Sequence, residues 1–300
     1  ADGGSLGGAE PISVRLEIPD GHLGGTYAET PGRMGPWQSS DGRLWFPMEP
    51  AETFNVLMMM VSADGGRSWT EADGSNRPVT DDLEGFATAY ERGVIHILHQ
   101  ISERAVYHAF STSDAPDGSE GWIVRDEVVA DHPEPPVQAA SLEALADGTL
   151  VAAFVSGNQI EIRRKAPGGS WTATDTLVGG STEGWILSGP QTTVAPGGRV
   201  HLVWTETNGS EGVAYHGLIG SDGTVEARQR VAEGLGGTES DVGSVAPLVL
   251  TPETNEVAMV YRRADGRLAE RRVRGGGTMT PEAVVSNRIV TQYAVYSDQV

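Results

Sequence analysis

The sequence has no cysteine among its 300 residues, so it forms neither disulfide bonds nor a thiolate-bound zinc site. It has no apolar run near the roughly 18 residues that a membrane-spanning helix needs, and we expect no membrane insertion. Long stretches of helical periodicity are also missing, which favours short strands over helices. Lysine is almost absent, because Lys165 is the only lysine among the 21 basic residues.

Positive charge is scarce overall. The chain has 41 acidic and 21 basic residues, and its formal net charge at pH 7 is -20. A surface this acidic repels a phosphate backbone, so nucleic acid is excluded as a partner. Residues 1–11 are small and polar, as in a flexible N-terminus left by removal of a signal peptide. We therefore expect a secreted, extracellular protein, and we expect it to be a monomer.

Glycine and proline are abundant, with 40 and 17 residues, and indicate many strands joined by tight turns. Turn residues recur at Gly42, Gly93, Gly148, Gly198 and Asn255, at intervals of 51, 55, 50 and 57 residues. A repeat of this length is typical of one four-stranded blade of a β-propeller. The repeated segments read "PWQSSDGRLWFPM", "GFATAYERGVIHILHQ", "AASLEALADGTLVAAFV", "PQTTVAPGGRVHLVW" and "APLVLTPETNEVAMVY".

The two ends of the chain contain a sixth unit in pieces, and joining them would remove exposed sheet edges. We predict an all-β fold in which residues 1–300 form a single β-propeller domain of six blades, each a four-stranded antiparallel sheet. The last blade is shared between the N- and C-termini, and a five-bladed ring is the alternative. The approximate blade boundaries are 33–80, 81–132, 133–184, 185–240, 241–288, and 289–300 together with 12–32.

The segment Val61–Ala72, "VSADGGRSWTEA", has the residues of a tightly bonded hairpin turn. Ser62 and Asp64 supply local acceptors, Gly66 tolerates a positive φ, and Trp69 packs under the loop. The pattern resembles the Asp-box of BNR-repeat propellers in the sialidase-like superfamily. That resemblance implies a structural corner on the outer rim of a blade, between its third and fourth strands.

The resemblance also implies what a true sialidase needs: three arginines, a tyrosine nucleophile with a glutamate partner, and an aspartate acid/base. Arg33 has a similar offset to the family's first arginine, and Tyr296 resembles its nucleophile. The segment that should carry a second arginine and the aspartate instead has Glu49 and Glu52. Authentic sialidase activity is therefore disfavoured. His132, in the rigid loop "ADHPEPPVQ", is the candidate general base of a lyase-like site.

In propellers, a ligand funnel forms where second-to-third-strand loops and blade-to-blade connections converge around the axis. Aromatic, amide and carboxylate side chains in such a funnel suit sugar rings. The alternative for each residue is a structural role, because tryptophans at blade entrances seal cores and loop carboxylates are solvated. Besides Arg33, the residues placed there are Trp37, Glu52, Glu84, Phe86, Gln138, Trp185, Gln191, Glu206, Asp241, Arg262 or Arg263, and Tyr293.

No cofactor is expected, because no glycine-rich stretch follows a strand and opens a helix as phosphate and dinucleotide sites require. Asp81, Asp82 and Glu84 form an acidic loop with the oxygen ligands of a structural calcium site, although EF-hand spacing is absent.

Three functions remain open. The first is a secreted propeller that recognises a carbohydrate-like ligand in its axial funnel, with non-sialidase glycoside hydrolase or polysaccharide lyase chemistry as its enzymatic form. The second is a non-catalytic, lectin-like or protein-binding propeller with pockets between several blades. The third is an enzyme of small-molecule metabolism with a mostly apolar funnel.

Overall fold

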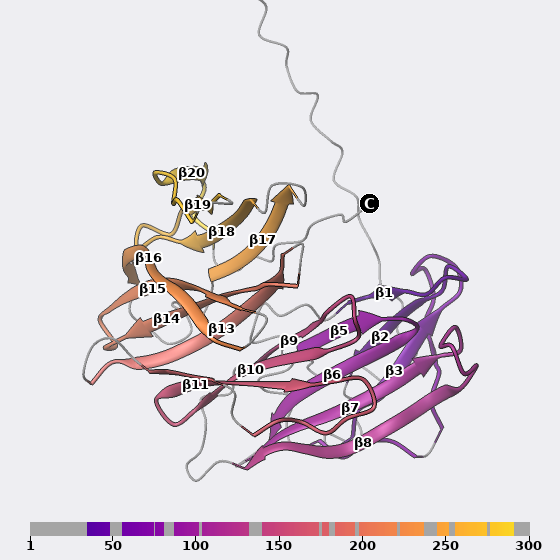
Figure 1. Ribbon diagram of the computed structural model, residues 1–300. Helices are drawn as coiled ribbons and strands as arrows, with labels where there is room; N and C mark the ends of the chain where they lie inside the picture. The colour runs from indigo at the N-terminus through magenta and orange to yellow at the C-terminus, as the bar shows by residue number, and fades with distance from the viewer. Residues whose placement is uncertain are drawn as a thin grey trace, which may run out of the picture.

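The computed structural model describes residues 35–48, 56–74, 76–80, 87–101, 104–131, 140–173, 176–179, 184–195, 198–220, 223–236, 245–251, 256–274 and 277–290. These residues form strands but no helix, arranged as five four-stranded antiparallel sheets (Figure 1). The described ranges accordingly contain no helix long and apolar enough to cross a membrane. The all-β prediction is confirmed.

We number the sheets 1 to 5 along the chain, and in each the strands are neighbours in chain order. Sheet 1 contains β1 (Trp37–Gln38), β2 (Leu44–Met48), β3 (Met58–Ser62) and β4 (Thr70–Glu71). Sheet 2 contains β5 (Ala87–Glu91), β6 (Val94–Ile101), β7 (Arg104–Thr112) and β8 (Glu120–Asp131). Sheet 3 contains β9 (Ala140–Ala144), β10 (Leu150–Ser156), β11 (Gln159–Lys165) and β12 (Thr176–Gly179).

The last two sheets follow the same plan. Sheet 4 contains β13 (Ile186–Val194), β14 (Val200–Thr207), β15 (Glu211–Ile219) and β16 (Val225–Gly236). Sheet 5 contains β17 (Val245–Thr251), β18 (Glu256–Arg262), β19 (Leu268–Val273) and β20 (Ala283–Ser286). The expected sixth unit, 289–300 with 12–32, lies almost wholly outside the described residues, so the number of blades stays a prediction.

The first strands of sheets 2 to 5 pack side by side, so these sheets follow one another around a common centre (Figure 1). Because consecutive strands run in opposite directions, the first-to-second and third-to-fourth turns lie together at one end of the strands of each sheet. We call this the turn edge. The second-to-third turns and the connections between sheets lie at the opposite edge, which we call the connection edge. The predicted funnel belongs to the connection edge.

Glycines close the turn edge in a repeated geometry. In sheet 1, Gly42 donates its N–H to Ser39 O at 2.9 Å. Gly148 and Gly198 make the corresponding bonds in sheets 3 and 4, at 2.8 and 3.1 Å. All three glycines have φ between 77 and 87°, a region that side chains with a Cβ rarely adopt. The repeat seen in the sequence is therefore a repeat of turns.

The core lies between adjacent sheets, because central strands are buried on both faces. All eight residues of β14 are buried. Leu202 and Trp204 pack against Val151 and Ile162 of sheet 3, while Val203 faces sheet 5. Full burial of each large apolar side chain stabilises the fold by about 1.5–3 kcal/mol.

Arginine side chains link neighbouring sheets. Arg92 Nη2 in sheet 2 donates to Ala146 O at 2.8 Å, and Arg228 Nη1 in sheet 4 donates to Gly179 O at 3.0 Å. Guanidinium carries five N–H donors in a planar fork, so one side chain can bond a carbonyl of the next sheet and still pair with a carboxylate. The compact ammonium of lysine has no such fork and is less suited to bonding both groups at once.

The turn between β3 and β4 is held by its own side chains. Asp64 Oδ1 accepts the N–H groups of Arg67 and Ser68, both at 2.9 Å, and Ser62 Oγ accepts the Gly66 N–H at 2.8 Å. Trp69 Nε1 donates to Gly66 O at 3.1 Å, and the Trp69 ring is buried. Hydrogen bonds donated by Ser68, first by its hydroxyl and then by its backbone N–H, hold the pKa of Asp64 well below its usual range.

Candidate functional site

Six of the sequence-predicted ligand-binding residues lie within the described ranges: Trp37, Trp185, Gln191, Glu206, Arg262 and its alternative Arg263, which pairs with Asp265 and Glu282. The acidic calcium loop lies outside those ranges and stays a prediction. So do the other ligand-binding and catalytic candidates: Arg33, Glu52, Glu84, Phe86, His132, Gln138, Asp241, Tyr293 and Tyr296.

Trp37 joins the first two sheets. Its Nε1 donates to Thr88 Oγ1 at 2.9 Å, and its ring stacks on Tyr90 with centroids 6.3 Å apart. The side chain is half-buried. These contacts are those of a tryptophan that seals the space between two sheets.

Glu206 is fully buried between sheets 3 and 4 and does not overhang a funnel. Its Oε1 accepts from Trp204 Nε1 at 3.2 Å and pairs with the Arg228 guanidinium. The guanidinium lies 4.4 Å from the ring centroid of Tyr215 and 5.2 Å from that of Trp204. Gln191 is also buried, on β13.

Trp185 is half-buried at the connection edge, just before β13. The amide of Asn158, from the β10–β11 turn, bonds the backbone at Trp185 itself and two residues further on. Asn158 Nδ2 donates to Trp185 O at 2.7 Å, and Asn158 Oδ1 accepts from Leu187 N at 3.0 Å. Trp185 is therefore a rigidly mounted aromatic surface at the predicted end of the molecule. Arg262, at the end of β18, is likewise half-buried.

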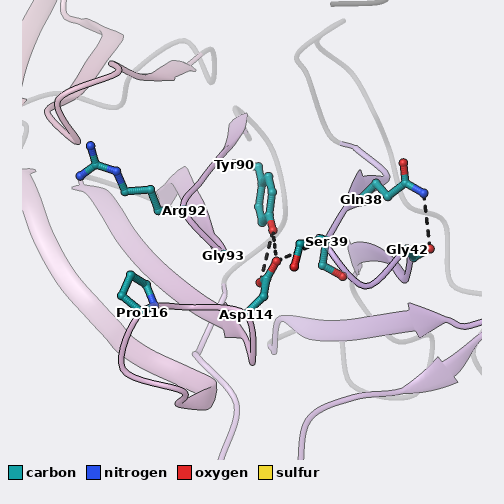
Figure 2. Close-up of a pocket in the computed structure, with 9 residues that line it drawn as sticks. Gln38, Ser39, Gly42, Tyr90, Arg92, Gly93, Asp114 and Pro116 are labelled. Atoms are coloured by element: carbon teal, nitrogen blue, oxygen red, sulfur yellow. Dashed lines mark hydrogen bonds between the residues drawn. The ribbon is translucent and has the colours of Figure 1, made fainter. Parts of the chain in front are cut away.

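A cleft of about 760 Å³ opens at the turn edge, between sheets 1 and 2 (Figure 2). The β1–β2 turn forms one wall, the β5–β6 turn a second, and the β7–β8 loop its floor. Figure 2 shows Tyr90 and Asp114 facing each other at its centre. The lining residues are Gln38, Ser39, Ser40, Gly42, Tyr90, Arg92, Gly93, Asp114 and Pro116.

Gly93 allows the floor to approach the second wall. Its carbonyl accepts both the N–H and the Oγ1–H of Thr112 at 2.9 Å. A Cβ on Gly93 would lie 2.5 Å from Ala115 N and 2.6 Å from Asp114 Oδ1, and φ there is 77°. A side chain at this position would displace the loop that carries Asp114.

Asp114 joins three segments that are far apart in the sequence. Its Oδ2 accepts Ser40 N at 2.8 Å and Tyr90 Oη at 3.0 Å, and its Oδ1 accepts from Thr112 Oγ1. Burial alone would raise the pKa of Asp114, but the bonds from Ser40, Thr112 and Tyr90 outweigh it and leave that pKa lowered. Burial raises the pKa of Tyr90. At neutral pH the cleft thus presents a carboxylate beside a protonated phenol.

The remaining polar side chains are a guanidinium, an amide and two hydroxyls, so only that of Arg92 is purely a donor. Arg92 Nε pairs with Glu91 Oε1 at 2.7 Å, which offsets its charge, and Gln38 contributes an exposed amide. Among the described residues that line the cleft, Asp114 is the only carboxylate, and none is a histidine or lysine. The cleft therefore offers paired hydrogen-bond donors and acceptors beside an aromatic ring, rather than an acid and a base. Nowhere in the described ranges do three or more histidine, aspartate or glutamate side chains group as metal ligands do.

Sequence reasoning missed this cleft because it placed the ligand at the opposite edge. The residue that organises it, Asp114, lies in "STSDAPDGSEGW", which reads as a weakened copy of the Asp-box turn. The aspartate in this Asp-box-like turn was the available signal.

The chain matches no protein-family model. It also matches no curated protein sequence. Its fold does match solved structures. A lectin from Burkholderia pseudomallei is 12% identical, with a TM-score of 0.60 over 82% of this chain and 67% of that one. The fucose-specific lectin from Aleuria aurantia is 12% identical, with a TM-score of 0.56 over 83% and 76%. An α-L-arabinofuranosidase from Fusarium graminearum is 15% identical, with a TM-score of 0.52 over 87% and 81%. These similar structures are propellers, and the likeness shows that this chain has a β-propeller fold.

Proposed function

We propose that this protein is a carbohydrate-binding propeller whose cleft between sheets 1 and 2 holds a neutral sugar. One observation carries the proposal: Tyr90, Asp114 and Ser40 are locked together at the base of an open cleft that also has amide and guanidinium donors. Sugar hydroxyls both donate and accept, so they match a surface that offers both kinds of group.

Size and charge agree with a small saccharide. A volume of about 760 Å³ is within the usual range of small-molecule sites, about 300–1,000 Å³. The phenol of Tyr90 is fixed by Asp114, so little order has to be created on binding. Similar solved structures include a fucose-specific lectin and an arabinanase complexed with arabinobiose. They support a carbohydrate as the ligand class.

The cleft favours binding over hydrolysis. Glycoside hydrolases generally use two carboxyl groups on either side of the scissile bond, and the described part of the cleft lining provides Asp114 alone. Hydrolase or lyase chemistry in an axial funnel, through Arg33, His132 and Tyr296, stays a prediction, and so does secretion.

The connection edge is a second candidate position for a sugar. The observation that favours it is Trp185, whose carbonyl is bonded by Asn158, as is the N–H of Leu187 two residues further on. A half-exposed, rigid indole is the surface on which the apolar face of a sugar ring stacks.

Titration with L-fucose and with arabinobiose, followed by NMR, tests the proposal. Tyr90→Phe keeps the ring and removes the hydroxyl, and we expect it to weaken binding about 5- to 10-fold, the value of one hydrogen bond. Trp185→Ala is the matched control at the other edge and should leave the affinity unchanged. Arabinobiose should remain intact during the titration.

Three results would argue against this function. The first is that neither sugar binds at millimolar concentration, and the second is that Tyr90→Phe binds as tightly as the wild type. The third is that arabinobiose is cleaved. Loss of binding in Trp185→Ala alone would move the ligand to the connection edge.

A further inference from the structure

Two buried histidines lie in the same interface as the cleft, between sheets 1 and 2. His99 on β6 and His108 on β7 have no exposed surface. Their rings stack with centroids 4.8 Å apart and planes 12° apart. His108 Nε2 is 3.1 Å from His99 Nδ1, so the two rings share one hydrogen bond.

The surrounding contacts determine where the protons are. Asp126 N donates to His108 Nδ1 at 3.0 Å, so the proton of His108 is on Nε2 and is donated to His99. His99 must then carry its proton on Nε2, a buried nitrogen with no partner in the described part of the chain. Both rings are neutral in this arrangement.

Little negative charge faces the pair to stabilise a cation. Asp126 Oδ1, from β8, is 3.8 Å from His108 Nδ1, but it is half-exposed and bonded to Val79 N. On the sheet 1 side, Asp73 and Arg77 lie beyond Trp122 and pair with each other. Burial lowers the pKa of both histidines, and the charge of His99 lowers that of His108 further.

A row of aromatic side chains connects the pair to the cleft. His108 meets Trp122 edge-on at 6.4 Å, Trp122 meets Phe110 at 5.1 Å, and Phe110 meets Trp45 at 5.6 Å. Trp45 Nε1 donates to Ser39 Oγ at 2.7 Å, and Ser39 lines the cleft. Displacement at the histidines therefore reaches the cleft wall through packed rings.

We propose that protonation of the His99–His108 pair opens the interface between sheets 1 and 2 and so releases the ligand of the cleft in mildly acidic solution. The release rests on the proposed function, whereas the opening does not. An imidazolium needs water or a counter-ion, and the closed interface offers the pair only the half-exposed Asp126 carboxylate, whereas separation of the sheets admits water. Between pH 7 and 5 the open form gains roughly 20-fold for each histidine that is protonated only after opening.

The chain contains a matched control. His201 on β14 and His216 on β15 form a second buried pair, with Nδ1 and Nε2 2.8 Å apart. Both histidines lie on the same face of sheet 4 as Val203, and Val203 packs against sheet 5. This pair has the same chemistry but lies in another interface, away from the cleft.

Hydrogen exchange at pH 7 and pH 5, corrected for the intrinsic effect of pH, measures the opening. In the wild type at pH 5, we expect residues 39–45 to exchange at least 10-fold faster, with the β9–β10 hairpin as internal reference. In the double variant His99→Asn/His108→Asn, amide groups that do not titrate replace the imidazoles near the positions of their Nδ1 atoms. This variant should lose the acceleration. The variant His201→Asn/His216→Asn should keep it.

The wild type alone already exposes the proposal to refutation, even where a variant folds poorly. Equal protection of residues 39–45 at both pH values would overturn it. So would acceleration that persists in His99→Asn/His108→Asn, because Asp73, whose pKa burial raises, would then be the responsible group.

L-fucose and arabinobiose titrations at both pH values separate release from opening. We expect at least 10-fold weaker binding at pH 5 in the wild type, and equal binding at both pH values in His99→Asn/His108→Asn. Binding that is equal in the wild type would refute the release. If neither sugar binds at either pH while exchange responds as expected, the proposed function fails and the acid-dependent opening stands.

Discussion

Gly93 shows at the scale of a residue how the lack of a side chain shapes the cleft. Gly93→Ala adds a Cβ that would lie 2.5 Å from Ala115 N, at a φ of 77°. We expect a loss of about 2–4 kcal/mol in unfolding free energy, because backbone strain and displacement of the floor add up. Urea unfolding measures it. Sugar binding should weaken together with stability.

Gly42 provides the control for that variant. Its φ is 85°, but nothing lies within 4 Å of a Cβ built there. Gly42→Ala should therefore cost only the backbone strain, about 1 kcal/mol. Equal losses in the two variants would mean that the close approach at Gly93 is unimportant.

Glu206 illustrates a second residue-scale effect, the buried charge. Removing its cationic partner by Arg228→Met leaves a carboxylate in a dry interface, and we expect about 3 kcal/mol of destabilisation in urea unfolding. Arg199→Met is the comparison, because the Arg199–Glu226 pair is about half exposed on both sides. It should cost less than about 1 kcal/mol. A similar cost for both would argue that Arg228 contributes packing rather than charge.

At the scale of the element, the β3–β4 hairpin should depend on the Asp64 carboxylate. Asp64→Ala removes the acceptor of the Arg67 and Ser68 N–H groups, and we expect faster hydrogen exchange over residues 67–71 with a red-shifted Trp69 emission. Asp147→Ala, in a turn where the carboxylate accepts from Thr149 N, is the control and should leave this hairpin unchanged.

The pKa of Asp64 makes the hairpin persistent in acid. A carboxylate with a lowered pKa stabilises its turn above the unfolded value and loses that effect only as the pH falls through the folded value. Residues 67–71 should therefore stay protected at pH 4, where the histidine interfaces are already destabilised. If residues 67–71 and the histidine interfaces lost protection at the same pH, Asp64 and the histidines would not be titrating independently.

At the scale of the whole molecule, four buried histidines and the half-buried His96 should make stability depend on pH. Burial lowers the pKa of His96 to about 4, and it also lowers the pKa values of the pairs His99–His108 and His201–His216. A histidine of this kind stabilises the fold fully above its unfolded pKa of about 6.5, and that stability is lost as pH falls towards the folded value. Each contributes a slope of about 1.4 kcal/mol per pH unit within that window.

Urea unfolding at several pH values from 7.5 to 4.5 tests this. We expect unfolding free energy to fall steeply below pH 6.5, and to fall less steeply in His201→Asn/His216→Asn. A flat profile across this range would show that the histidines are hydrated in the folded protein.

Much of the architecture was readable in the sequence. The strands and their turns follow from alternation of apolar residues and from glycines such as Gly42, Gly148 and Gly198, where only a positive φ closes the turn. The Val61–Ala72 corner is equally local, because its side-chain hydrogen bonds join residues at most four apart. The candidate site was not readable: Trp37 and Glu206 became structural partners once neighbouring sheets were placed beside them.

What the sequence determined by itself is therefore the repeated β unit, its turn chemistry and a strongly acidic net charge, since these depend on neighbouring residues and on composition. Only the tertiary structure decided that Asp114 meets Ser40, 74 residues away, that Glu206 is buried, and that His99 lies on His108. Such meetings depend on strand register and on how one sheet lies against the next. Backbone preferences within a single repeat do not specify either of them.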